Sequence, residues 1–233
     1  MKQMGQEARL NYIVEELKKD SGSFRDMEVR PRDRRRVMRS LMNIRMPGPL
    51  PAGFLEIQDE FLREEAREKG IVGLSDIPTV KEQYGSSALF GDRISIWQGD
   101  ITRLQVDAIV NAANSRMLGC FVPGHNCIDN AIHTFAGVQL RAACHAMMER
   151  QGHGEPTGQA KITPGFNLPA SWVLHTVGPQ IQGVLKPRHC EQLASCYTAC
   201  LQKAADFQLK TLVFCCISTG EYHFPPQTAA PIA

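Results

Sequence analysis

The sequence contains no long hydrophobic run. Its 233 residues are 43% hydrophobic, yet no stretch approaches the roughly 18 consecutive apolar residues of a membrane-spanning helix. The first twenty residues intersperse charges where a signal peptide would have an uninterrupted apolar stretch. We therefore expect a protein with no membrane association and a cytoplasmic location.

The sequence also has little net charge. Its 26 Lys and Arg residues almost balance 24 Asp and Glu residues, which gives a formal charge of +2. Binding of long nucleic acid relies on neutralising many phosphates, and this balance gives no support for it. Any anionic ligand is expected to be small. The sequence also lacks internal repeats and low-complexity segments, and its length suits one α/β domain with an extension.

Cysteine is well represented, with 8 residues. Disulfides are rare in the reducing cytosol, so free thiols or metal ligands are the better interpretation. The spacing of the cysteines has to decide between these two.

The first part of the chain, residues 1–85, is predicted to be a helical extension. Apolar residues recur at helical spacing from Leu10 to Leu17, and this helix is expected to end near residues 21–22. Residues 30–45 and 54–69 are two further predicted helices. Three short helices seldom form a stable domain alone, so we expect them to pack on the remainder. The basic run at 30–45 is interpreted as a solvated helix face in preference to a nucleic-acid or phosphoprotein contact.

Residues 86–233 are predicted to form an α/β domain. Short runs rich in β-branched residues alternate with helical stretches, the pattern of a mainly parallel or mixed sheet covered by helices. The predicted strands are residues 94–98, 108–111, 160–163, 172–177 and 211–217, and the predicted helices are residues 127–151 and 189–207.

Three loops that follow predicted strands carry small or polar residues, in the position where open α/β sheets bind ligands. Asp100 follows the first strand, and the amides of Asn111 and Asn114 end the second, where they can cap a turn or bind a sugar. The loop after the last strand, residues 217–225, has small residues whose backbone N–H groups are free to bind phosphate.

Five motifs follow one another along the chain: GDIT, VDAIVNAAN, PTGQAKITPGFNLP, WVLHTVGP and CISTGEYHFP. This succession, from about residue 90 onward, closely resembles the macrodomain family. The resemblance implies a three-layer α/β/α sandwich with a mixed central sheet and a cleft for ADP-ribose. It also implies that about 30 or more residues of the usual fold, which would complete one side of the sheet, are absent after residue 233.

The resemblance implies ligand contacts for particular residues. Asp100 would bind the adenine amino group, Ile101 would line the adenine pocket and Asn114 would meet the distal ribose. The residues implied to surround the diphosphate are Ser218, Thr219, Gly220, Glu221 and Tyr222. Tyr222 and Phe224 would close over the ligand or, equally, anchor their loop to the core.

One segment distinguishes this chain from most macrodomains, which have a short glycine run there. Cys120, His125 and Cys127 stand within eight residues that include Pro123 and Gly124. Two thiols and an imidazole can converge on one Zn²⁺ and leave its fourth tetrahedral position open, which is typical of a catalytic metal. The spacing alone leaves incidental cysteines equally open, and the neighbouring motifs favour zinc.

With its helical N-terminal part, the chain resembles zinc-containing microbial macrodomains that are often encoded beside a sirtuin-type ADP-ribosyltransferase and are ADP-ribosyl hydrolases. The resemblance implies a zinc-dependent hydrolase that removes ester-linked mono-ADP-ribose from protein side chains. Asp129, at the start of a predicted helix, is placed to orient a water or take its proton, or else to interact with the helix N-terminus. The catalytic set expected is Asn114, Asp129 and the ligands Cys120, His125 and Cys127.

Two other functions fit the same cleft. A reader module would bind ADP-ribose, or an ADP-ribosylated protein, without turnover, and would use zinc only to grip the ribose. A deacetylase would act on O-acetyl-ADP-ribose, a small molecule.

Overall fold

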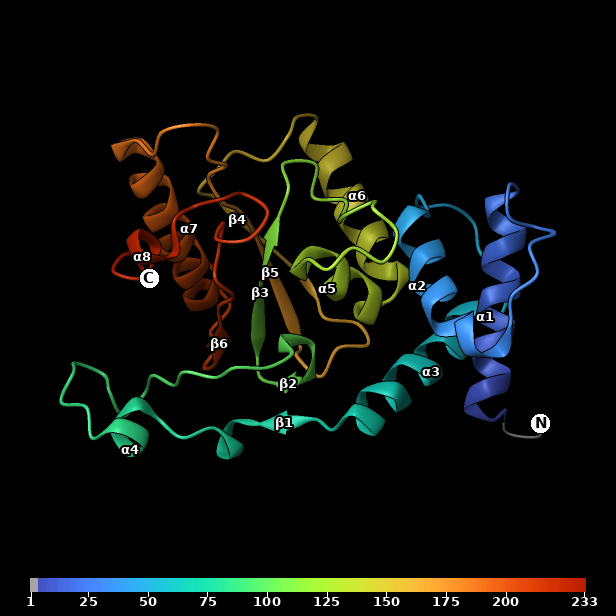
Figure 1. Cartoon of the computed structure of the whole chain (residues 1–233), viewed down its shortest axis with the longest axis horizontal. Helices are drawn as coiled ribbons and strands as arrows, with labels where there is room; N and C mark the ends of the chain where they lie inside the picture. Colours follow the sequence, from blue (N-terminus) through green and yellow to red (C-terminus); the bar gives the residue numbers. More distant parts are fainter. Residues whose placement is uncertain (1–3) are drawn as a thin grey trace.

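The computed structural model describes residues 4–233, and its centre is a mixed four-stranded sheet (Figure 1). The strands lie in the order β4 (Ala160–Pro164), β5 (Trp172–Val177), β3 (Ala108–Ala113) and β6 (Leu212–Val213). β3 pairs in parallel with β5 and with β6, whereas β4 is antiparallel to β5. The predicted mixed sheet is confirmed.

Helices cover both faces of this sheet. α5 (Ile128–Ala136) and α6 (Val138–Gln151) lie on one face, and α7 (Pro187–Asp206) lies on the other. Successive side chains of a strand point to opposite faces. Accordingly, Ile109 packs with Ile132 and Leu140 of the first face, while Val110 packs with Leu193 of the second. The three-layer α/β/α prediction is thus confirmed.

The N-terminal part consists of three helices, as predicted: α1 (Gln6–Ser21), α2 (Arg34–Ile44) and α3 (Phe54–Lys69). They have a core of their own, in which Leu10, Ile13 and Phe61 are at most 2% exposed. The boundary between residues 85 and 86 stays a prediction.

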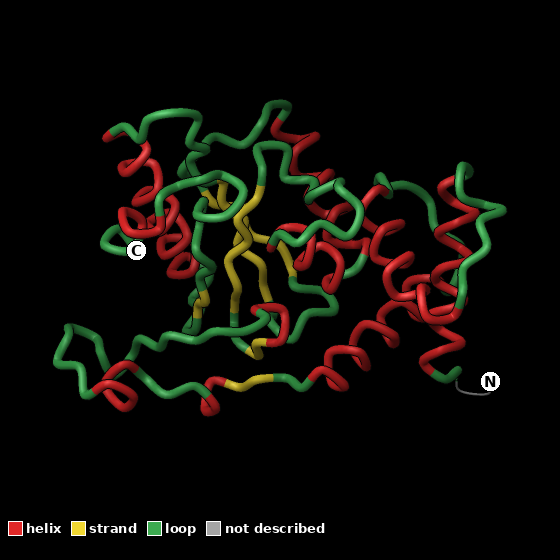
Figure 2. The backbone as a smooth tube through the Cα atoms, viewed as in Figure 1, coloured by secondary structure: helices red, strands yellow, loops and turns green. Residues whose placement is uncertain are grey.

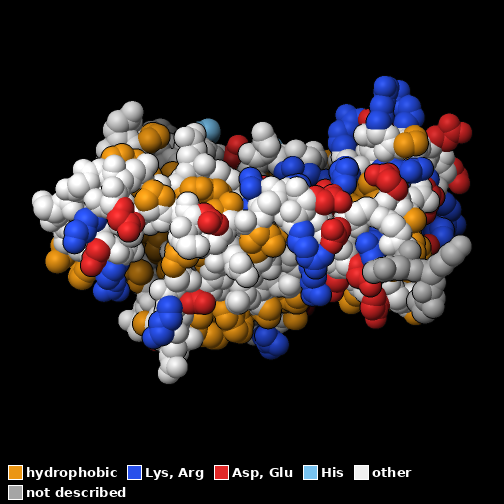
Figure 3. Space-filling model, turned by 90° about the horizontal axis from the view of Figure 1, so that it is seen from below, with side chains coloured by type: hydrophobic (Ala, Val, Ile, Leu, Met, Phe, Trp, Pro, Cys, Tyr) orange, Lys and Arg blue, Asp and Glu red, His pale blue; other side chains and the backbone are white. Residues whose placement is uncertain are grey.

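Basic side chains cluster at the end of the molecule that these helices form (Figure 3). Several of them have acidic partners nearby. Arg30 and Arg36 both pair with Asp33, and Arg35 pairs with Glu65. These pairs agree with the interpretation of the basic run as a solvated helix face.

Two predictions of secondary structure were wrong. The single helix expected over residues 127–151 is divided into α5 and α6 by Gly137, whose φ of 94° lies outside the helical range. Residues 94–98 form no strand. Ser95 makes one isolated bridge to Thr79, and the side chains of Ile94 and Ile96 are 49% and 63% exposed. A strand needs a hydrogen-bonded neighbour along its length, and within residues 4–233 this segment pairs only at its start, beside Thr79 and Val80.

The shorter elements connect these parts. A second sheet pairs β1 (Val72–Gly73) with β2 (Leu104–Gln105), and between these two strands the chain runs through a long arm with few regular elements (Figure 2). The remaining elements are α4 (Val80–Tyr84), α8 (Pro226–Ala229) and the 3-10 turns η1 (Pro31–Asp33), η2 (Leu74–Asp76) and η3 (Ile101–Arg103). Across residues 4–233, no helix has both the length and the apolar character needed to cross a bilayer.

Candidate functional site

A cleft of about 750 Å³ opens beyond the carboxyl end of β3. Three segments line it: residues 112–116, which end β3 and follow it; residues 119–129, which lead into α5; and residues 215–222, which follow β6. Ligands of α/β sheets bind at this end of the strands. Of the residues predicted for the site, those that line the cleft are Asn114, Cys120, His125, Cys127, Asp129, Ser218, Thr219, Gly220, Glu221 and Tyr222.

Cys120, His125 and Cys127 converge at the side of the cleft formed by residues 119–129. One ligand atom from each of the three lies within 4.8 Å of the other two, and Cys120 Sγ is 3.6 Å from Nδ1 of His125. The turn that brings them together passes through Gly124, whose φ is 66°. Two thiols and an imidazole in reach of one point are a donor set that suits Zn²⁺, so the residues fit the predicted ion.

Cys127 also begins α5, where its sulfur accepts a hydrogen bond from the backbone N–H of Asn130 at 3.4 Å. Burial, with a smaller contribution from the nearby Cys120, raises the pKa of the Cys127 thiol to about 11, against the opposing effect of the Asn130 N–H. Two thiolates so close would repel each other. A cation between them would remove that repulsion and favour the deprotonated form that binds metal.

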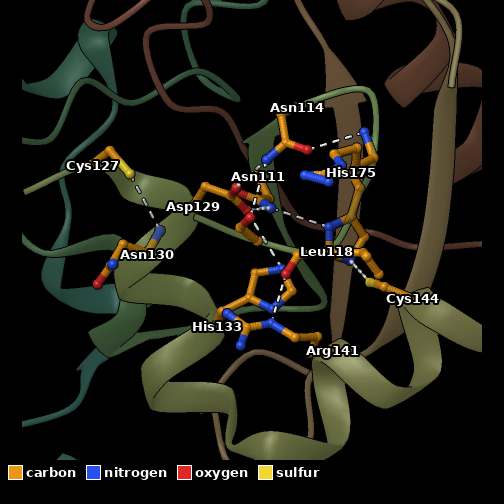
Figure 4. A network of polar contacts seen from close by, with 12 residues as sticks. Asn111, Asn114, Leu118, Cys127, Asp129, Asn130, His133, Arg141, Cys144 and His175 are labelled. Atoms are coloured by element: carbon orange, nitrogen blue, oxygen red, sulfur yellow. Dashed lines mark hydrogen bonds and ion pairs between the residues drawn. The ribbon is translucent and has the colours of Figure 1, made fainter. Parts of the chain in front are cut away.

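Asp129 is the second residue of α5, lines the cleft and is 5% exposed. Its Oδ1 accepts a hydrogen bond from Asn111 Nδ2 at 2.8 Å, and its Oδ2 accepts one from Asn114 Nδ2 at 3.3 Å (Figure 4). Burial raises the pKa of this carboxyl to about 6, against the opposing effects of Asn111 and Arg141. A carboxyl held by two amides and directed at the cleft can take a proton from a bound water.

Asn114 has a fixed orientation. Its Nδ2 also donates to the carbonyl of Gly119 at 3.1 Å, and its Oδ1 accepts from the backbone N–H of Arg116 at 3.0 Å. The side chain therefore links the end of β3 to the residue that precedes Cys120.

Asn111 and His175 support Asp129 from below the cleft. Asn111 is fully buried and does not line the cleft, so the structure does not place it for the sugar contact considered for it. Its Nδ2 lies 3.2 Å from Nδ1 of His175, whose Nε2 is 2.9 Å from Thr163 Oγ1. Because the amide nitrogen is a donor, Nδ1 of His175 accepts, and its proton is on Nε2. Sequence reasoning missed His175, although a histidine within the apolar strand at 172–177 was a usable signal.

The loop of residues 218–222 forms the opposite wall. Ser218 has a φ of 64°, a left-handed conformation that is unusual for a residue with a side chain. Its Oγ is buried and makes no hydrogen bond to any described residue. Such strain with an unsatisfied polar group is common at ligand sites, and here Ser218 lines the cleft. Glu221, on the same loop, reaches across to His125, with Oε1 3.6 Å from Nε2.

Three predicted ligand residues lie elsewhere. Asp100 accepts hydrogen bonds from the N–H and hydroxyl of Thr102, and Ile101 packs in the core cluster beside α5. Both precede β2, which leads into the amino end of β3, and the cleft lies at the other end of that strand. Phe224 is fully buried against α7, so of its two expected roles the structure supports the anchor. The structure brings none of these three residues to the cleft.

Comparison with known proteins assigns the family. A family model of the Macro domain matches residues 110–233. A protein-ADP-ribose hydrolase from Treponema medium is 51% identical, with 99% of this chain and 87% of that protein covered. This chain belongs to the macrodomain family. A protein of the same name from Staphylococcus aureus is 43% identical, with 97% and 82% covered.

Solved macrodomain structures agree with this assignment. The Trypanosoma brucei macrodomain in complex with ADP-ribose has a TM-score of 0.61 and 30% identity, with 84% of this chain and 79% of that chain covered. The Oceanobacillus iheyensis macrodomain with ADP has a TM-score of 0.53 and 42% identity, with 58% and 69% covered. The second match covers less of this chain.

Proposed function

We propose that this macrodomain is a zinc-dependent hydrolase that removes mono-ADP-ribose from modified proteins, acting on an ester linkage. The observation that carries the proposal is the convergence of Cys120, His125 and Cys127 on the same cleft as Asp129 and Asn114. The names of the relatives from Treponema and Staphylococcus support the hydrolase activity. A sirtuin-type ADP-ribosyltransferase is the kind of enzyme we propose as the source of the modified protein.

Cys120, His125 and Cys127 would hold the zinc ion at the side of the cleft. A zinc ion there supplies a Lewis acid for a ribose hydroxyl or lowers the pKa of a bound water. The thiolates would neutralise its charge, and the half-buried position of all three side chains leaves access from the cleft.

The other groups bind and orient the substrate. The loop at residues 218–222 lines the cleft, and its backbone N–H groups and the hydroxyl of Ser218 would bind the diphosphate. Asn114 lies at the metal side, where the distal ribose would then lie. This arrangement would place the anomeric carbon near Asp129.

Asp129 would orient the attacking water and accept its proton at Oδ2. That oxygen receives only the longer hydrogen bond, 3.3 Å from Asn114 Nδ2, while Oδ1 is held by Asn111 at 2.8 Å. Attack of the oriented water on the anomeric carbon would break the bond between that carbon and the ester oxygen. ADP-ribose would be released, the protein side chain would leave as a carboxylate, and the proton of the water would remain on Asp129.

The test uses an ester-linked mono-ADP-ribosylated protein as substrate and measures free ADP-ribose. The chain as purified should contain about one zinc per molecule and release ADP-ribose. Cys120→Ala and chelation should abolish both the zinc and the release, and zinc added after chelation should restore them. Cys190→Ala, on α7 outside the cleft, is the matched control and should behave as wild type.

Other outcomes contradict the proposal in different ways. Tight binding of ADP-ribose without release would indicate a reader. Turnover of O-acetyl-ADP-ribose but not of the modified protein would indicate a deacetylase. Release that survives complete removal of metal would refute the zinc requirement.

A further inference from the structure

Helix α2 of the N-terminal part contacts the loop that carries the proposed metal ligands. Arg39, half-buried on α2, donates from Nη2 to the carbonyl oxygen of His125 at 2.8 Å. It also donates from Nε to Oδ1 of Asn130 at 2.9 Å. Asn130 in turn donates from Nδ2 to the carbonyl of Val122 at 3.0 Å. One guanidinium therefore fixes the backbone of a proposed ligand and a side chain that anchors the same loop.

Asn43 makes a second connection one turn further along α2. Its Oδ1 accepts a hydrogen bond from the backbone N–H of Gly124 at 2.9 Å, and its Nδ2 donates to Thr134 Oγ1 at 3.1 Å. Asn43 is 1% exposed. Gly124 stands immediately before His125, so two residues of α2 hold the backbone on both sides of the Gly124–His125 peptide bond.

A third connection starts from the core. Arg141 of α6 donates from Nε to the carbonyl of Leu118 at 2.6 Å, and from Nη1 to the carbonyls of Met42 and Arg45 at 2.9 and 2.5 Å. Its guanidinium carbon lies 4.4 Å from the ring centroid of Phe121. The Arg141 side chain thus holds both the carboxyl end of α2 and the residues that precede Cys120.

From these contacts we infer that α2 positions the loop of residues 119–127, which carries the proposed metal ligands. The N-terminal helices therefore contribute to zinc binding at the proposed site. Residues 119–127 form no helix or strand. Their ligand geometry therefore depends on contacts from outside the loop, and α2 holds the backbone of two consecutive loop residues, Gly124 and His125. A loop held in its bound conformation before metal arrives loses less conformational entropy on binding. Arg39 and Asn43 act through His125 and Gly124, as positioning residues.

This inference rests on the proposed zinc site, and zinc affinity tests it directly. Arg39→Met keeps the aliphatic packing but removes both hydrogen bonds. It should weaken zinc binding about 10- to 100-fold, the usual effect of losing a partner that orients a metal ligand. The zinc affinity of Arg39→Lys, which retains one donor group, should lie between that of Arg39→Met and that of wild type. Affinity is measured by competition with a chromogenic chelator.

Arg36→Met is the matched control. Arg36 is exposed on the same helix, and Asp33 is its ion-pair partner. The zinc affinity of Arg36→Met should equal that of wild type. The unfolding free energy and the ADP-ribose affinity of metal-free Arg39→Met are measured in parallel, and ADP-ribose affinity should be unchanged because Arg39 does not line the cleft.

The outcomes separate the two proposals. Zinc affinity of Arg39→Met within threefold of wild type, whatever its stability, overturns the positioning role and leaves the zinc site intact. Loss of zinc affinity in the Arg36→Met control to the same extent also overturns it, because the effect would not depend on the contacts described. A wild-type chain that binds no zinc overturns both proposals.

Discussion

Asn111 donates a 2.8 Å hydrogen bond to Oδ1 of Asp129, and neither residue is more than 5% exposed. A buried carboxylate needs such donors, because removing it from water is costly unless other groups satisfy it. The bond also leaves Oδ2, which accepts only the longer hydrogen bond from Asn114, as the oxygen available for chemistry at the cleft. Several consequences of this arrangement and its surroundings can be measured.

Asn111→Ala should damage both stability and activity. Without the amide, Asp129 loses its shorter hydrogen bond in a buried environment, and the unfolding free energy should fall by about 1–3 kcal/mol. Release of ADP-ribose should slow by up to about 100-fold, because the carboxyl is no longer held in position. Urea denaturation and single-turnover rates measure the two effects. Asn11→Ala, on α1, is the control. An equal loss of stability and activity in that variant would show that the effects do not depend on the contact with Asp129.

Gly119→Ala should weaken zinc binding through a steric conflict. The φ of Gly119 is 79°, and a Cβ atom there would lie 2.8 Å from Cγ of the buried His133 ring. The left-handed conformation alone costs about 1–2 kcal/mol for other residues. Gly152 provides the control, because its φ is 74° and no atom lies within 4 Å of the added Cβ.

Both glycine variants should therefore lose stability in thermal unfolding, and Gly119→Ala should lose more. Only Gly119→Ala should also reduce zinc content, since it displaces the residue next to Cys120. Equal zinc content in the two variants would show that this contact does not affect the site.

Ser218→Gly should stabilise the fold and weaken ligand binding. Glycine relieves the strain of a φ of 64°, and after its own entropic cost the unfolding free energy should rise by about 1 kcal/mol. Removal of the hydroxyl should weaken ADP-ribose binding. Ser218→Ala loses the hydroxyl but keeps the strain, so calorimetry on both variants separates the effects. An affinity equal to wild type in both would exclude a role for Oγ in binding.

His175 should make the metal-free protein less stable in acid. Burial lowers the pKa of His175 from 6.5 to about 4. Its contribution to stability is therefore present above pH 6.5 and is lost as the pH falls toward 4, because the unfolded chain takes up the proton first. At about 1.4 kcal/mol per pKa unit, the loss is about 3 kcal/mol.

Urea denaturation of wild type and His175→Gln between those pH values measures this contribution. The raised pKa of Asp129 has the opposite pH dependence, so the difference between the two proteins is the quantity to compare. The variant should show a shallower decline in acid, and His153→Gln, at an exposed position, should match wild type. If the unfolding free energies of wild type and His175→Gln declined in parallel with pH, His175 would not be the source of the acid destabilisation.

Much of the fold could be predicted from sequence because its signals are local. Helical spacing located α1, α2 and α3, and the apolar run at residues 172–177 coincides with β5. The strand predicted at 94–98 had the same kind of local pattern. It failed because a strand also needs a partner, which local sequence does not specify.

The site divides in the same way. The sequence determined the kinds of chemical group available, two thiols and an imidazole around Pro123 and Gly124, and an acid at the start of a helix. Only the tertiary structure placed Asp129 against Asn111, put Asp100 and Ile101 at the far end of β3, and brought Arg39 to the carbonyl of His125, 86 residues away in the chain. Spacing along the chain limits which neighbours can meet within one turn or loop. Contacts between distant segments are decided by which faces of helices and sheet are buried together.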